Sequence, residues 1–169
     1  AKSAPLHDIG KVGIPDHILL KPGKLDAQEW DLMKEHARYG AEAIEQAELD
    51  VAHPVPFLAF AKQIARHHHE RWDGQGYPDG LAGEAIPVAA RLMAIADVFD
   101  ALISRRVYKP AFPRDQAYQM IVSERGRQFD PDVVDAFIEE FPTLCAIAAH
   151  YADSEEGVSA KLAAVGGNR

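Results

Sequence analysis

The chain of 169 residues has 18 basic and 26 acidic side chains, a formal net charge of −8, and 47% hydrophobic residues. This composition predicts one soluble globular domain, and the negative charge argues against binding to nucleic acid polymers or anionic membranes, which need a basic surface. The apolar runs are too short or too interrupted by charge to span a bilayer, and no signal segment opens the chain, so we expect a cytoplasmic protein without membrane insertion.

The hydrophobic pattern is helical throughout and predicts an all-α fold, a compact domain of about six to seven helices. Residues 3–11 read as the end of one helix, and residues 15–23 as a connecting loop. The next helix begins at Asp26, an N-cap with Glu29 placed for a capping box, and its apolar face runs from Trp30 to Ile44. Because the chain starts without Met and inside a predicted helix, we expect a fragment whose upstream part is absent.

A third helix leads into the run His67-His68-His69. A loop rich in glycine and proline follows at residues 73–86, and long loops in compact domains often carry function. From Pro87 a helix that is apolar on most sides is predicted to lie centrally.

Two further helices are predicted, one over residues 116–125 and one that begins at Asp130 and Pro131. We bound the domain at residues 1–153 and expect residues 154–169 to be a mobile C-terminal tail. The single Cys145 lies in an apolar run, where we expect it to be buried and unreactive.

Histidine and aspartate side chains recur on several predicted helices and form a candidate shared metal site: His7, Asp8, His36, His68, His69 and Asp97. For the histidine run the alternative is an exposed polar segment, and for His36 it is a hydrogen-bonded structural role. Asp97 lies in an apolar helical run, where an unpaired carboxylate is costly to bury and needs a cation or strong donors nearby.

The spacing of these residues favours more than one metal ion. Adjacent residues such as His7 and Asp8 point about 100° apart on a helix, which suits two neighbouring ions better than one, with Asp8 as a bridging carboxylate. Imidazole and oxygen ligands without cysteine suit iron or manganese, with zinc as a third candidate. Two ions about 3.5–4 Å apart can clamp the attacking and leaving oxygens of a phosphoester, so the pattern predicts phosphoester hydrolysis.

Motifs in a fixed order surround these residues. They include Leu6-His7-Asp8-Ile9-Gly10-Lys11, His68-His69-Glu70-Arg71 leading to Asp73-Gly74-Gln75-Gly76-Tyr77-Pro78, Ala96-Asp97-Val98-Phe99-Asp100, and Phe129-Asp130-Pro131. Together they resemble the HD-GYP domain, the metal-dependent cyclic di-GMP phosphodiesterase branch of the HD phosphohydrolase superfamily. The resemblance covers about residues 6–137, most of the chain.

The resemblance implies hydrolysis of cyclic di-GMP to pGpG, GMP or both at a site with two or three divalent ions, iron before manganese. It makes Asp8 and Lys11 catalytic, with Lys11 approaching the phosphate. Residues near the nucleotide are then Lys11, Tyr77, Asp100, Arg106 and Lys109. His67 has no matching role, and we expect it to face solvent.

The resemblance also implies partners. The loop Gly76-Tyr77-Pro78 is expected to contact GGDEF-domain diguanylate cyclases, and an N-terminal regulatory domain is expected upstream. The alternative function is a cyclic di-GMP receptor or interaction module with little or no catalysis. Two departures from the family pattern matter: Val107 replaces a proline between Arg106 and Lys109, and the chain begins after the helix that supplies further ligands in the family.

Overall fold

The computed structural model describes residues 3–51, 53, 55–104 and 111–166, with side chains up to residue 150. Within these residues it contains seven α-helices, three short 3-10 helices and no β-strand, which confirms the all-α prediction. In chain order the elements are η1 (Ala4–Leu6), η2 (Ile9–Gly13), α1 (Asp16–Leu19), α2 (Ala27–Lys34), α3 (His36–Leu49), α4 (Pro56–His67), η3 (Gly83–Ala85), α5 (Val88–Ile103), α6 (Arg114–Ser123) and α7 (Pro131–Gly166).

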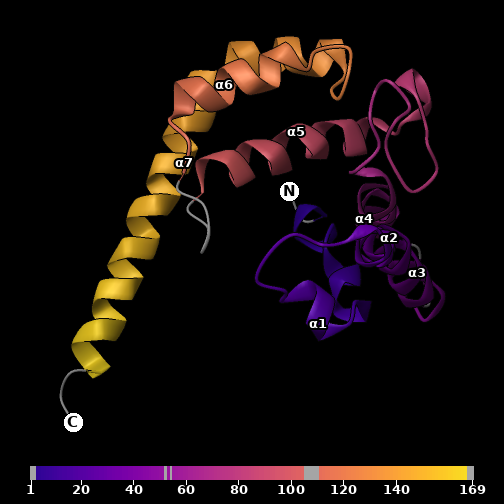
Figure 1. Cartoon of the computed structure of the whole chain (residues 1–169), viewed down its shortest axis with the longest axis horizontal. Helices are drawn as coiled ribbons and strands as arrows, with labels where there is room; N and C mark the ends of the chain where they lie inside the picture. The colour runs from indigo at the N-terminus through magenta and orange to yellow at the C-terminus, as the bar shows by residue number, and fades with distance from the viewer. Residues whose placement is uncertain (1–2, 52, 54, 105–110, 167–169) are drawn as a thin grey trace.

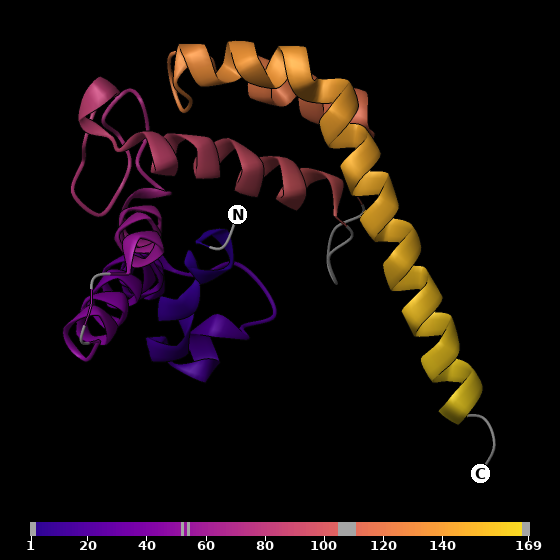
Figure 2. The ribbon, with the colours of Figure 1, turned by 180° about the vertical axis from the view of Figure 1, so that it is seen from behind.

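Helix α5 lies between the two halves of the fold. The N-terminal segments and α2 to α4 lie on one side of it, and α6 with the first half of α7 lies on the other (Figures 1 and 2). Helix α5 packs against α4, α6 and α7, so the prediction of a central helix is confirmed. The second half of α7 runs past the end of α5, away from the other helices (Figure 1).

The core has two parts. Between α5, α6 and α7 the largest cluster contains Ile95, Phe99, Ile121, Val134 and Phe137, each at most 6% exposed. A smaller cluster joins α3 to α4 through Ile44, Ala61 and Ala65. The candidate metal ligands belong to neither cluster. They lie between η1 and η2, at the start of α3, at the end of α4 and on α5.

Several helix boundaries differ from the sequence prediction. Residues 3–11 form the short helices η1 and η2 instead of one helix end, and the expected loop at residues 15–23 contains α1. The expected continuous helix from Asp26 breaks at Glu35 into α2 and α3. At this break the His36 side chain forms a hydrogen bond with the backbone, since its Nδ1 atom lies 2.7 Å from the carbonyl oxygen of Met33.

Capping groups account for the boundaries that were predicted correctly. Asp26 and Glu29 form the expected capping box at the start of α2. Asp130 precedes α7 and accepts a hydrogen bond from the backbone N–H of Asp132 at 2.9 Å, as an N-cap does. The backbone of α7 stays helical to Gly166, while the domain boundary at residue 153 stays a prediction.

No helix in the described part of the chain combines the length and the apolar character that crossing a membrane requires.

Candidate metal centre

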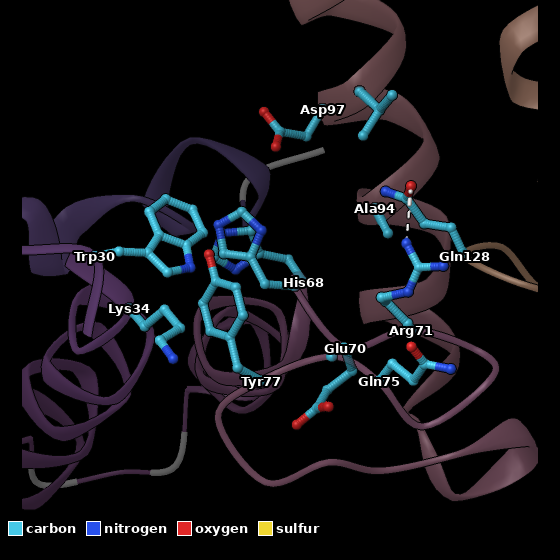
Figure 3. A pocket seen from close by; sticks show the side chains of 13 residues that line it. Trp30, Lys34, His68, Glu70, Arg71, Gln75, Tyr77, Ala94, Asp97 and Gln128 are labelled. Atoms are coloured by element: carbon cyan, nitrogen blue, oxygen red, sulfur yellow. Dashed lines mark hydrogen bonds between the residues drawn. The ribbon is translucent and has the colours of Figure 1, made fainter. Parts of the chain in front are cut away.

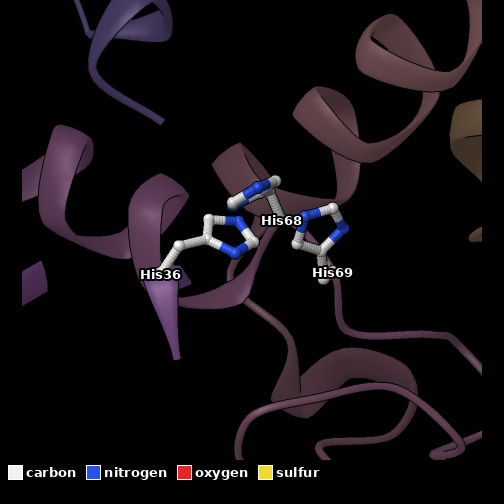
Figure 4. A group of neighbouring side chains, drawn as sticks. All are labelled: His36, His68 and His69. Atoms are coloured by element: carbon white, nitrogen blue, oxygen red, sulfur yellow. The ribbon is translucent and has the colours of Figure 1, made fainter. Parts of the chain in front are cut away.

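Four separate segments bring the candidate ligands together. His7 and Asp8 join η1 to η2, His36 is the first residue of α3, and Asp97 lies within α5. His68 caps the C-terminal end of α4, and His69 follows it. The imidazoles of His36, His68 and His69 converge (Figure 4), and their nearest ligand atoms all lie within 4.8 Å of one another.

Asp8 connects two groups of ligands. Its Oδ1 atom lies 3.6 Å from Nε2 of His36 and 3.9 Å from Nε2 of His68. Its Oδ2 atom lies 3.2 Å from Nε2 of His7, which in turn lies 3.8 Å from Oδ1 of Asp97. The two carboxylate oxygens therefore face different ligand groups, which is the arrangement that a bridging carboxylate between two ions requires.

Backbone carbonyls orient three of the imidazoles. The Nδ1 atom of His7 lies 2.8 Å from the carbonyl oxygen of Ala4, and that of His68 lies 2.9 Å from the carbonyl of Ile64. His36 makes the same kind of bond to Met33. Because a carbonyl oxygen can only accept, Nδ1 carries the proton in each ring, and in the neutral ring Nε2 keeps a free lone pair for a metal.

Buried atoms without partners mark the same place. Within the described residues, the buried side-chain atoms that lack a hydrogen-bond partner are Oδ1 of Asp8, Nε2 of His36, Nε2 of His68 and Nδ1 of His67. Leaving such atoms unpaired is costly, and three of them point into the same cluster. A divalent cation would satisfy all three, so the residues fit a metal.

The histidines of the cluster differ in the direction in which their pKa is shifted. Burial lowers the pKa of His68 to about 4 and that of His69 to about 2, so both rings are neutral and ready to bind a metal. The hydrogen bond to Asp8 raises the pKa of His7 despite its burial. Burial opposes ionisation of Asp8, but hydrogen bonds from His7 and Lys11 hold the pKa of its carboxyl far below the usual range.

The predicted nucleotide-binding residues are placed in part. Lys11 lies at the cluster, with Nζ 2.6 Å from Oδ2 of Asp8. The Tyr77 ring stacks on the His69 ring with centroids 4.8 Å apart. Asp100 is exposed three residues beyond Asp97 on α5, whereas Arg106 and Lys109 lie outside the described residues.

The glycine-rich loop is fixed to the end of α4 by Glu70. Its buried carboxylate points away from His68 (Figure 3) and accepts hydrogen bonds from the backbone N–H groups of Asp79, at 2.7 Å, and Leu81, at 3.1 Å. At Gly76 a Cβ atom would lie 2.4 Å from the backbone nitrogen of Arg71, so only glycine allows this close approach. The loop therefore holds Tyr77 against His69.

The expectation that His67 faces solvent is wrong. Its side chain is only 14% exposed, and its Nδ1 atom lies 3.4 Å from Oδ2 of Asp79. The last turn of α4 points His67 toward the loop, while His68 and His69 point toward the cluster. The sequence shows three equivalent histidines, so this division needed the structure.

A pocket of about 430 Å³ opens beside the cluster and contains residues that the sequence did not single out (Figure 3). Trp30 and Lys34 of α2 line one side, and Gln128 lines the other. Trp30 was expected on the apolar inner face of its helix, but it is 47% exposed. From sequence, an aromatic residue at helical spacing is predicted to lie in the core. Only the three-dimensional arrangement identifies Trp30 as a residue of this pocket.

Comparisons with known proteins agree with this geometry. A family model described as HD domain matches residues 1–133. A "Cyclic di-GMP phosphodiesterase" of Vibrio cholerae serotype O1 is 60% identical over 153 residues, which cover 90% of this chain and 31% of that protein. The "Cyclic di-GMP phosphodiesterase response regulator RpfG" of Xanthomonas campestris pv. campestris is 52% identical over 136 residues, 80% of this chain and 34% of that protein.

A third relative carries a different substrate in its name. The "3'3'-cGAMP-specific phosphodiesterase 2" of Vibrio cholerae serotype O1 is 45% identical over 151 residues, 89% of this chain and 28% of that protein. The chain thus spans about a third of the length of these curated relatives.

Proposed function

The chain belongs to the HD domain family, in its HD-GYP branch, and on that premise we propose that it is a metal-dependent phosphodiesterase that hydrolyses cyclic di-GMP. The observation that carries the proposal is the group of buried, unpaired ligand atoms on Asp8, His36 and His68. Their convergence supports a divalent metal site, and the names of the similar proteins support a cyclic dinucleotide as the substrate.

We assign the metal ligands in two groups that share Asp8. One group consists of His36, His68 and His69, and the other of His7 and Asp97. Divalent ions, if held by these residues, would supply Lewis acid activation of water and charge stabilisation at the phosphate. The imidazole and carboxylate donors favour iron first, manganese next and zinc third.

Lys11 is the cation placed to bind the phosphate. Its Nζ atom already pairs with Oδ2 of Asp8 at 2.6 Å, and its side chain is 41% exposed. Metal ions that bind Asp8 would compete for this carboxylate, which would leave the ammonium group of Lys11 free to neutralise a nonbridging phosphate oxygen. Asp8 therefore acts as ligand and Lys11 as phosphate anchor, with products pGpG, GMP or both.

The test pairs metal content with turnover. Protein prepared without oxygen is analysed for iron, manganese and zinc, and its products from cyclic di-GMP are separated by chromatography. Asp8→Ala should lose metal and turnover together, because it removes the residue common to both ligand groups. Asp115→Ala, an exposed aspartate on α6, serves as the matched control and should keep both. Hydrolysis by a metal-free Asp8→Ala protein would contradict the proposal.

A receptor without catalysis is the alternative function, and the converging imidazoles of His36, His68 and His69 speak against it. Calorimetric titration with cyclic di-GMP separates the two, since tight binding without product would favour the receptor. Contact of Gly76-Tyr77-Pro78 with GGDEF-domain proteins and an upstream regulatory domain both stay predictions.

A further inference from the structure

Two aromatic rings, Tyr77 and Trp30, line the pocket beside the metal centre and stand nearly perpendicular to each other, with an interplanar angle of 81°. The Tyr77 ring is stacked on His69, and Trp30 meets Tyr77 edge-on with centroids 6.2 Å apart. Ala94 of α5 lies opposite these rings (Figure 3), and Val98 of the same helix also lines the pocket. A slot between an aromatic ring and small apolar side chains suits a flat aromatic ligand, because stacking on such a ring needs no particular substituent.

The end of the slot presents hydrogen-bond donors. Arg71 is held by Asp73, which accepts from its Nε and Nη2 atoms at 3.1 and 2.9 Å. The Nη1 atom of Arg71 donates to Oε1 of Gln128 at 3.3 Å (Figure 3). Because this bond uses the amide oxygen, the NH₂ group of Gln128 is left as a donor, and in the described part of the chain it makes no hydrogen bond.

The slot and the metal centre share residues. His68, His69 and Asp97 line the pocket and also belong to the ligand groups, so a molecule in the slot reaches the metal end directly. Asp100 lies three residues after Asp97 on α5, in the direction away from Ala94. A cyclic dinucleotide, with two bases on one ring of two phosphates, has the layout to place its phosphates at the metals and one base in the slot.

We propose that this pocket, formed by Trp30, Tyr77, Ala94, Val98 and Gln128, binds one guanine base of the substrate. The inference rests on the proposed function and extends it to substrate selection. The Hoogsteen edge of guanine presents two neighbouring acceptors, N7 and O6, whereas adenine presents an acceptor beside an NH₂ donor. A slot that ends in donors therefore selects guanine over adenine.

Binding can be tested without turnover. GMP and AMP are titrated into metal-free protein while tryptophan fluorescence is followed. GMP should quench the fluorescence of Trp72→Phe protein, which retains Trp30, and should leave that of Trp30→Phe protein unchanged. AMP should bind at least about fivefold more weakly, as expected for the loss of one good hydrogen-bonded pair. Equal quenching by GMP and AMP, or no quenching that depends on Trp30, would overturn the proposal.

Selectivity provides the second test. The ratio of kcat/KM for cyclic di-GMP to that for cyclic di-AMP should fall roughly tenfold in Gln128→Met, which keeps the side-chain length but removes the donor. Gln116→Met, at an exposed position on α6, should keep the wild-type ratio. A wild-type ratio in Gln128→Met would refute the guanine site while leaving the phosphodiesterase intact. Failure of the wild-type protein with bound metal to hydrolyse any cyclic dinucleotide would instead refute the proposed function.

Discussion

Replacing Gly10 by alanine should move the segment that carries His7 and Asp8 away from the other candidate metal ligands. Gly10 is buried where η2 crosses the start of α3, and a Cβ there would lie 2.0 Å from the carbonyl oxygen of His36 and 2.3 Å from the backbone nitrogen of Gly40. Both neighbours are backbone atoms, so no side chain can rotate away. The two segments must move apart instead.

The distances set the size of the effect. Contacts of a Cβ atom below 3.0 Å are essentially never tolerated, so the segments must separate by about 1 Å. Overpacking of this kind typically costs about 1–3 kcal/mol of folding free energy. Metal sites tolerate only about 0.2 Å of error in ligand distances, so the shift between Asp8 and His36 should cost far more in metal affinity than in stability.

Two measurements check this. Urea unfolding gives the free energy, and elemental analysis gives the metal bound at fixed free concentration. Gly13→Ala, three residues further along η2, is the matched control, because its Cβ would meet only the ring edge of Tyr39 at 3.0 Å, and that side chain can shift. We expect Gly10→Ala to fold and lose metal, and Gly13→Ala to keep it. A Gly10→Ala protein with wild-type metal content would refute the reasoning.

Two further predictions follow from charge. The pKa of His7 is raised by its bond to Asp8, whereas burial lowers that of His68 to about 4, so above pH 5 the proton that competes with a metal is held by His7. Metal affinity should therefore fall as the pH drops through the pKa of His7. Metal binding should release about one proton per site, as measured by calorimetry in buffers of different ionisation enthalpy. Release of two protons would contradict this prediction. The Asp130 side chain is 3% exposed and lies 2.6 Å from Arg91, so Asp130→Ala should lower the free energy of unfolding in urea by about 3–5 kcal/mol. Asp132→Ala, at an exposed position in the first turn of α7, should lower it far less.

The candidate ligands could be selected from the sequence because such side chains are unusual in the segments where they occur. Asp97 interrupts an apolar run, and a carboxylate there needs a partner. Its partner in the structure is His7, from a segment far away in sequence. The local geometry of that segment was not predictable, because the short helices η1 and η2 depend on the contact of Gly10 with α3, which no local pattern encodes.

The pocket residues that the sequence did not identify are side chains whose sequence context gives no sign of a binding role. Trp30 fits the apolar periodicity of its helix, yet it is 47% exposed. Gln128 lies in a polar turn and has no distinctive neighbours in sequence. Both can be recognised as pocket residues only from the structure, which places them beside Tyr77 and Arg71.

The end of α4 links the metal centre to that pocket. Within four consecutive residues, His68 and His69 face the ligand cluster, while His67 and Glu70 face the glycine-rich loop. Glu70 fixes the loop that carries Tyr77, and Tyr77 stacks on His69. A base that packs against Tyr77 would therefore contact the ring that stacks on His69, which we assign to the metal, so the proposed base site and the proposed metal site would be coupled through this one stacked pair.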